Sequence, residues 1–207
     1  MCLNPPLTKR FLKNLFEKLK SLQIKYEVSG CKTINLYFQD ESRFGLLTVL
    51  RRMITAKGIK PTAPFLHRFD NLYLFGAFSP VTGTGCLLEM PHCNSQTFQI
   101  FLDHLSEQHP EDFKIMILDN GAFHHARRLQ IPSNIALVFL PPYSPELNPA
   151  EKIWRYFKDR VSMIAYNSLQ ALQQKISEIA KGMTAGNVKS ICANEFYINT
   201  FKNAFNV

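Results

Sequence analysis

The sequence contains no apolar run of the ~18 residues that a helix needs to cross a bilayer. Its first residues, MCLNPPLTKRFLK, also lack the apolar core of a secretory signal. These two absences argue against a membrane protein and against a secreted one. We therefore expect a cytosolic or nucleoid-associated chain.

Cysteine is sparse and irregularly spaced. The five cysteines are odd in number and include no CxxC pair, so neither a closed disulfide framework nor a zinc cage is indicated. Low-complexity tracts and internal repeats are absent as well. With 207 residues and 46% hydrophobic content, the chain can bury one core, and we expect it to fold around one.

Acidic residues are the minority among the charged ones. There are 16 Asp and Glu against 24 Lys and Arg, which gives a net charge of +8 and a pI near 9.3. Such an excess favours a polyanionic partner, because basic side chains release counterions from nucleic acid when they bind. Ordinary solubility charge is the alternative, and we prefer nucleic acid.

What the chain does contain is a succession of strand and helix patterns. A helix is expected before Gly30, which marks a break, so residues 1–30 form an N-terminal helix and linker, and residues 31–207 form the main domain with C-terminal helices. Three successive strands, expected to be antiparallel, open this domain. Strand-like patterns cover residues 33–39, 46–50, 72–79, 86–89, 113–118 and 135–139, and helical patterns begin at residues 95 and 149 and cover 169–179 and 188–205.

Residues 113–118, FKIMIL, form a continuous apolar run, which is typical of a strand buried on both faces. The run ends abruptly at Asp119, Asn120 and Gly121. Ligands commonly bind outside the carboxyl ends of strands in open α/β sheets. Asp119 is therefore a candidate site residue.

Two further carboxylates occupy comparable positions. Asp40 falls at the expected end of the first strand. Glu151 falls in the first turn of a helix that follows a proline-rich loop, because Asn148 is a suitable cap and Pro149 suits the first helical position. Each carboxylate alone has an ordinary structural interpretation, such as stabilising a helix dipole. Paired strands would bring Asp40 and Asp119 side by side, and the docked helix could add Glu151.

Three carboxylates that converge would repel one another and raise at least one pKa, unless divalent cations neutralise them. Hard oxygen ligands select Mg²⁺ or Mn²⁺. Two such ions, about 3.5–4 Å apart, can activate a water and stabilise the leaving oxygen of a phosphodiester. We therefore expect the three carboxyl groups to converge on one cation-sized space at the edge of the sheet.

Three motifs in this order resemble the DDE transposases of the mariner-like superfamily, in the bacterial insertion-sequence branch. They are FQDES at Phe38 to Ser42, ILDNGAFH at Ile117 to His124, and LPPYSPELNPAEKIW at Leu140 to Trp154, of which the last is the most specific. The resemblance implies an α/β fold of the ribonuclease H-like type, a mixed sheet of about five strands flanked by helices. It also implies that Asp40, Asp119 and Glu151 are the catalytic, metal-binding triad, with two Mg²⁺ or Mn²⁺ ions.

The resemblance implies a transposase catalytic domain that cleaves DNA at element ends and joins the 3′-hydroxyl to target DNA. Its expected partners are transposon and target DNA and a second copy on DNA, in the bacterial cytoplasm or nucleoid. Family members carry a helix-turn-helix region before the catalytic domain, whereas only about thirty residues precede the first strand here. An upstream-frame polypeptide could supply that region. The alternatives are a catalytically idle DNA-associating subunit or truncated relic, and a stand-alone nuclease.

Other polar residues are candidates for supporting roles. Asn120 and His124 match the DN-x-x-x-H pattern of the family, where orienting a carboxylate or contacting a phosphate is expected. Glu41 would point to the opposite strand face from Asp40 if the strand continues, towards solvent or a supporting role. Trp154 is expected in the core. The remaining candidates for supporting or DNA contacts are Asn148, Arg51, Arg52, Lys57 and Lys60.

Overall fold

The computed structural model describes residues 5–26, 33–52, 54–60 and 62–206. At its centre is the mixed sheet of five strands that the sequence predicts, in the order β3-β2-β1-β4-β5. The strands are β1 (Thr33–Gly45), β2 (Asn71–Phe78), β3 (Gly85–Met90), β4 (Asp112–Leu118) and β5 (Ile135–Phe139). β1 pairs antiparallel with β2 and parallel with β4, so it is the strand where the two pairing modes meet.

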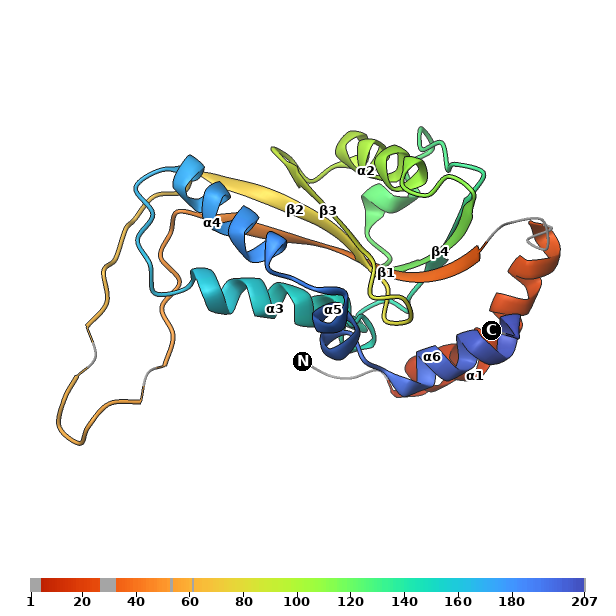
Figure 1. Cartoon of the computed structure of the whole chain (residues 1–207), viewed down its shortest axis with the longest axis horizontal. Helices are drawn as coiled ribbons and strands as arrows, with labels where there is room; N and C mark the ends of the chain where they lie inside the picture. The colour runs from red at the N-terminus through yellow and green to blue at the C-terminus, as the bar shows by residue number, and fades with distance from the viewer. Residues whose placement is uncertain (1–4, 27–32, 53, 61, 207) are drawn as a thin grey trace.

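Helices cover both faces of the sheet (Figure 1). On one face, α2 (Ser95–Glu107) packs a core that contains Phe75, Phe98 and Phe101. The other face carries a larger core, with Phe38 and Trp154 among its buried residues. The helices of that side are α1 (Pro5–Lys25), α3 (Ala150–Val161), α4 (Leu169–Lys181), α5 (Ala185–Ile191) and α6 (Glu195–Phe205). This double cover explains why β4 reads as an unbroken apolar run.

The first strand is longer than predicted. β1 continues through Asp40 to Gly45, because β2 pairs with it along this stretch. Residues 46–50, predicted as strand-like, form no strand. They begin a long connection to β2, residues 46–70, which we call the arm. Its base is closed by hydrogen bonds from Leu46 N to Asp70 O (3.0 Å) and from Thr48 N to Leu66 O (3.2 Å). The other described residues of the arm project away from the sheet (Figure 1, orange).

Several helix boundaries also differ from the predicted ones. α2 begins at residue 95, as its pattern predicts, and Asn94 caps it by accepting bonds from two backbone amides of its first turn. α3 begins at Ala150, one residue later than predicted. The pattern at residues 188–205 is two helices, since a new helix, α6, starts after Asn194, whose side chain caps it.

The N-terminal helix α1 packs against α6 (Figure 1), and its Phe11, Leu15 and Leu19 are buried in the same core as α3. The break predicted at Gly30 lies outside the described residues, and the division at that point stays a prediction. No helix in the described part of the chain is both long and apolar enough to cross a membrane.

Candidate active site

Asp40 lies within β1 rather than at its end. The last registered pair between β1 and β4 joins Phe38 to Ile117, and Asp40 and Asp119 each lie two residues beyond it. On its other side Asp40 is registered with Gly76 of β2. The parallel register of two central strands therefore places the first two carboxylates next to each other.

Asp119 follows the last residue of β4 and is held by a tight loop. Its Oδ1 accepts a hydrogen bond from the backbone amide of Gly121, at 3.0 Å. A Cβ on Gly121 would lie 3.1 Å from this Oδ1 and 3.2 Å from Nδ1 of His124, so the loop is close-packed at this point. The 3₁₀ turn η2 (Ala122–His125) comes next and carries His124.

Glu151 is in the first turn of α3, as its sequence position predicts. The start of this helix is tied to β1 by the buried side chain of Asn148. Its Nδ2 donates to the backbone oxygen of Gln39 at 2.8 Å, and its Oδ1 accepts from the amide of Ala150 at 3.1 Å. Because Gln39 precedes Asp40, Asn148 fixes α3 directly against the strand that carries the first carboxylate.

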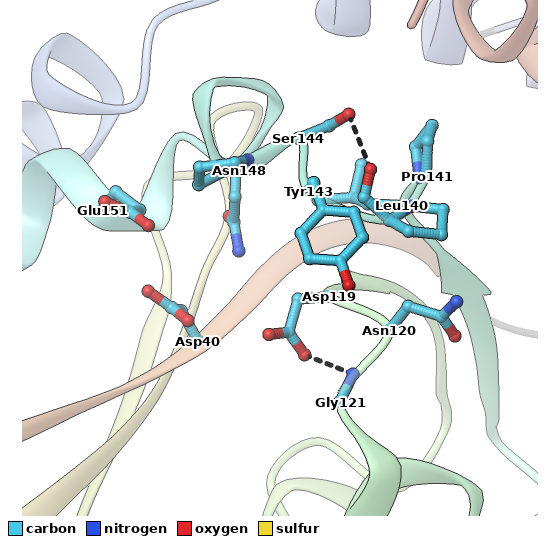
Figure 2. A pocket seen from close by; sticks show the side chains of 12 residues that line it. Asp40, Asp119, Asn120, Gly121, Leu140, Pro141, Tyr143, Ser144, Asn148 and Glu151 are labelled. Carbon is cyan, nitrogen blue, oxygen red and sulfur yellow. Dashed lines mark hydrogen bonds between the residues drawn. The ribbon is translucent and has the colours of Figure 1, made fainter. Parts of the chain in front are cut away.

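Asp40, Asp119 and Glu151 line one pocket, of about 390 Å³. Figure 2 shows their carboxyl groups on the same side of this pocket, with the proline-rich loop forming the other side. The pocket lies at the carboxyl end of β4 and beside the middle of β1. The prediction that the site lies at the strand ends is therefore right for β4 and wrong for β1, because β1 continues past the pocket. Among the described residues, no group of three His, Cys, Asp or Glu side chains could hold one metal ion as they stand.

His124 connects two carboxylates behind the pocket. Its Nδ1 lies 2.9 Å from Oδ1 of Asp119, in an ion pair not aligned as a hydrogen bond, and its Nε2 lies 3.1 Å from Oε1 of Glu41. The His124 side chain is 1% exposed. Burial opposes its charge, but the contacts with Asp119 and Glu41 outweigh burial and raise the pKa of His124 to about 9. His124 is therefore cationic at neutral pH and orients Asp119, while Glu41 supports it from the opposite face of β1.

The two aspartates of the pocket differ in their proton affinity. Burial, with the nearby charges of Glu41 and Glu151, raises the pKa of Asp40 to about 8. The contact with His124 lowers the pKa of Asp119, and the amide of Gly121 adds to this effect. Ionised Asp119 thus stabilises the fold near neutral pH and loses this contribution as pH falls. Folded Asp40 keeps its proton up to a higher pH than Asp40 in the unfolded chain. It therefore makes the free energy of unfolding fall as pH rises from about 4 towards 8.

This set of groups fits a divalent cation. The pocket presents carboxylate oxygens, which hard cations prefer, and it has an excess of negative charge, since the charges of Glu41, Glu151 and Asp119 add to the effect of burial in raising the pKa of Asp40. A cation held by Asp40, Asp119 and Glu151 would offset that excess. The cationic His124 faces Asp119 and Glu41 and so compensates only part of it.

Trp154 supports the site in a way that the sequence analysis missed. It is 3% exposed, as predicted for a core residue. Its Nε1, however, donates a hydrogen bond to Oδ2 of Asp40 at 2.9 Å. Two signals could have indicated this contact: a buried indole N–H needs an acceptor, and a spacing of three places Trp154 on the helix side of Glu151.

Two basic residues of α3 were also missed. Arg155 and Lys158 line a second pocket, of about 240 Å³, together with Arg51, Asp40 and Glu151. They follow Glu151 at helical spacing, which could have placed them on its face of the helix. The two pockets share Asp40 and Glu151, so one side of these carboxylates is bordered by the proline-rich loop and the other by cations.

The remaining predicted residues are divided between the pockets and the arm. Asn120 lines the first pocket, and its side chain bonds to His125. Arg51 lines the second pocket and pairs with Asp159 of α3. The structure does not bring Arg52, Lys57 or Lys60 to either pocket; these three are exposed on the arm.

The comparisons with known proteins agree with this geometry. The family described as "DDE superfamily endonuclease" matches residues 35–173, a range that contains all three carboxylates. A protein of Sinorhizobium fredii (strain NBRC 101917 / NGR234), named "Uncharacterized protein y4pE/y4sA", is 41% identical over 91 residues, which are 42% of this chain and 65% of that protein.

Solved structures of the Mos1 transposase have the same fold. A pre-cleavage Mos1 transpososome is similar with a TM-score of 0.67 and 16% identity, over 99% of this chain and 64% of that one. A Mos1 mariner paired-end complex with Mn gives a TM-score of 0.64 and 17% identity, over 98% and 62%.

The chain thus spans 65% of the curated relative and 62–64% of these Mos1 chains. The ribonuclease H-like architecture inferred from the three motifs is confirmed by this shared fold, and the family model covers most of the sequence. The chain therefore belongs to the DDE superfamily endonucleases.

Proposed function

We propose that this chain is the catalytic domain of a transposase, which cleaves DNA strands at element ends and transfers the resulting 3′-hydroxyl to target DNA. The observation that carries the proposal is the placement of Asp40, Asp119 and Glu151, from three separate elements, around one pocket. These three residues would hold two Mg²⁺ or Mn²⁺ ions. Bound ions would supply the activation of water or of the DNA hydroxyl and the stabilisation of the leaving oxygen.

The chain's own side chains would position these ligands. Trp154 directs Oδ2 of Asp40. His124, supported by Glu41, directs Asp119. Asn148 fixes the helix that carries Glu151. These contacts hold the three carboxylates at the pocket, and the carboxyl groups would close on the ions when the ions bind.

A cleavage and joining assay tests this proposal. The full chain, with an upstream DNA-binding region supplied in cis or in trans, should nick DNA carrying the element ends in Mg²⁺ and should join pre-cleaved ends to a target duplex. Cleavage without joining would favour the stand-alone nuclease. Failure of both steps, with DNA binding intact, would contradict the proposal and favour the idle DNA-associating subunit.

Cationic side chains border the path that DNA would take to the pocket. Arg51, Arg155 and Lys158 adjoin two of the carboxylates, where they could contact phosphates next to the reacting one. Arg52 and Lys57, exposed on the arm, would reach phosphates further away. Contacts of this kind position DNA without reading its bases.

We expect the chain alone to bind unrelated duplexes with similar affinity and a steep dependence on salt. The double variant Arg52→Gln and Lys57→Gln should bind more weakly at low salt. The slope of the logarithm of its binding constant against the logarithm of the salt concentration should become shallower by about 0.9 per phosphate contact removed. Lys202→Gln, an exposed change on α6, is the matched control and should leave the slope unchanged. Tight, salt-insensitive selection of one sequence would contradict this prediction.

We further propose a homodimer on DNA in the bacterial cytoplasm. The arm exposes apolar side chains, including Leu50 at 55%, Ile54 at 103% and Phe65 at 57%, and such surfaces are typical of protein contacts. Recognition of the end sequence would come from a helix-turn-helix region, carried in cis or on an upstream-frame polypeptide. One of the similar structures is a paired-end complex of the Mos1 mariner, which supports an assembly of this kind here.

A further inference from the structure

The exposed surface of α1 concentrates the positive charge of the chain. The helix contains six lysine or arginine residues and one acidic residue, Glu17. This excess of five basic residues compares with a net charge of +8 for the whole sequence. Lys20 is half-buried, and the other five basic residues are exposed, namely Lys9, Arg10, Lys13, Lys18 and Lys25.

The other helices carry an ordinary distribution of charge. α3, α4 and α6 mix acidic with basic residues, α5 carries one lysine, and α2 carries acidic residues without lysine or arginine. In α4 the opposite charges of Lys175 and Glu178 pair at 3.2 Å. In the described part of the chain, by contrast, no lysine or arginine of α1 pairs with an acidic side chain. Cations that repel one another in this way favour an anionic partner.

The apolar side of α1 is already covered. Phe11, Leu15 and Leu19 are 8%, 1% and 0% exposed and belong to the core that also contains residues of α3 and α6. A basic helix that lies on a membrane inserts its apolar side among the lipids, and here that side faces the core. A partner of α1 can therefore contact only the charged surface.

Aromatic rings hold three of the lysines in place. Nζ of Lys18 lies 5.6 Å from the ring centre of Phe11, and Lys20 and Lys25 lie over rings in the same way. Such contacts keep the lysine stems against the helix and restrict their rotamers. Less side-chain entropy is then lost when the ammonium groups bind an anion.

The charged surface has the dimensions of a stretch of duplex backbone. At 1.5 Å per residue, the 21 residues of α1 span about 30 Å, close to the ~34 Å of one duplex turn. Duplex DNA carries about one charge per 1.7 Å, so a rod of cations this long can meet several phosphates. Figure 1 shows α1 at the opposite end of the molecule from the arm, with α3 between them. The surface is thus separate from the cations of the arm.

We propose that the exposed surface of α1 is a second duplex-binding surface, which holds the sugar–phosphate backbone of DNA at a distance from the reacting phosphate. A duplex fits better than a membrane, because the surface is long and narrow and offers only charge. It contacts phosphates, so it adds affinity without sequence preference. The inference goes beyond the proposed function and does not depend on it, since it needs neither metal ions nor cleavage.

A triple variant tests the inference by removing cations from α1. Arg10→Gln, Lys13→Gln and Lys18→Gln together remove three exposed charges, and glutamine preserves helix propensity. On a duplex of about three helical turns, the variant should bind at least about tenfold more weakly than the wild-type chain at low salt. The slope of the logarithm of its binding constant against the logarithm of the salt concentration should become shallower by about 0.9 per phosphate contact removed.

The matched control removes the same net charge elsewhere, with Lys181→Gln, Lys189→Gln and Lys202→Gln, exposed on α4, α5 and α6. It should keep the wild-type slope. An equal change of slope in both variants would show that net charge alone is responsible and would overturn the inference. Vesicles containing phosphatidylserine present the other polyanion. A larger loss of vesicle binding than of duplex binding in the α1 variant would also overturn it.

Lysine acetylation of the wild-type chain, mapped by mass spectrometry, provides a readout that needs no variant. Bound duplex should protect Lys13 and Lys18 of α1 severalfold and leave Lys181 and Lys189 reactive. Lysines of α1 that react equally with and without DNA would contradict the inference. Neither measurement requires cleavage, so failure of the proposed function is distinguishable from failure of this inference.

Discussion

Asp119→Asn should lower the rate of strand cleavage in Mg²⁺ by at least about a hundredfold. Mutation of residues that only hydrogen-bond to the metal ligands already lowers metal affinity or activity by about 10–100-fold. Asparagine retains the oxygen that accepts from Gly121, so the loop after β4 should keep its shape. It removes the negative charge that would hold a cation. DNA affinity should stay the same or rise, because one repulsive charge near the phosphate is lost.

Two controls make this result specific. Asp103→Asn removes a carboxylate that is exposed on α2 and accepts from Gln99 within the same helix, and it should cleave like the wild-type chain. Ca²⁺ accepts the same oxygen ligands with looser geometry, so in place of Mg²⁺ it should support DNA binding with little cleavage. Wild-type cleavage by Asp119→Asn would refute the assigned role of this residue.

Gly76→Ala should destabilise the fold by about 1–3 kcal/mol, the range for overpacking a core. A Cβ at this position would lie 2.6 Å from the ring of Phe78 and 2.7 Å from the ring of Trp154. Because Gly76 is registered with Asp40 and Trp154 donates to that carboxylate, the same methyl group should disturb the site. A 207-residue chain should lose about 2–4 °C of Tm per kcal/mol.

The protein itself contains the probe for this effect, because Trp154 is the single tryptophan of the sequence. Its emission should change in Gly76→Ala together with the Tm. Gly186→Ala on α5 is the matched control, since its Cβ would meet only Thr184 Oγ1 at an ordinary 3.7 Å, and it should be neutral or slightly stabilising. Unchanged Tm and emission in Gly76→Ala would show that β2 and α3 are not in contact as described.

The sequence predicts the helices and strands that are determined by their own residues and their neighbours in the chain. Residues 113–118 are recognisable as β4 because the strand is buried on both faces. Glu151 is correctly placed in a first helical turn, because the prolines before it exclude a helix or a central strand in the preceding segment. The family motifs then add what spacing alone leaves open, namely the prediction that Asp40, Asp119 and Glu151 act together.

The features that sequence analysis misplaces depend on distant partners. Asp40 and Glu41 end the apolar alternation, so the strand seems to stop there, but Trp154 and His124 provide partners that allow it to continue. The apolar residues at 46–50 suggest a strand, yet Leu50 is among those exposed on the arm. The left-handed backbone of Tyr143 is invisible in the sequence because tyrosine rarely adopts it.

The most direct test of the central claim is to locate Mn²⁺ by anomalous scattering in crystals of the full chain with cleaved-end DNA. The account predicts Mn²⁺ bound by carboxylate oxygens of Asp40, Asp119 and Glu151, at the carboxyl end of β4. It also predicts that the hydrogen bond from Trp154 to Asp40 persists. Mn²⁺ bound elsewhere, or a Glu151 carboxylate turned away from an ion held by the two aspartates, would contradict it.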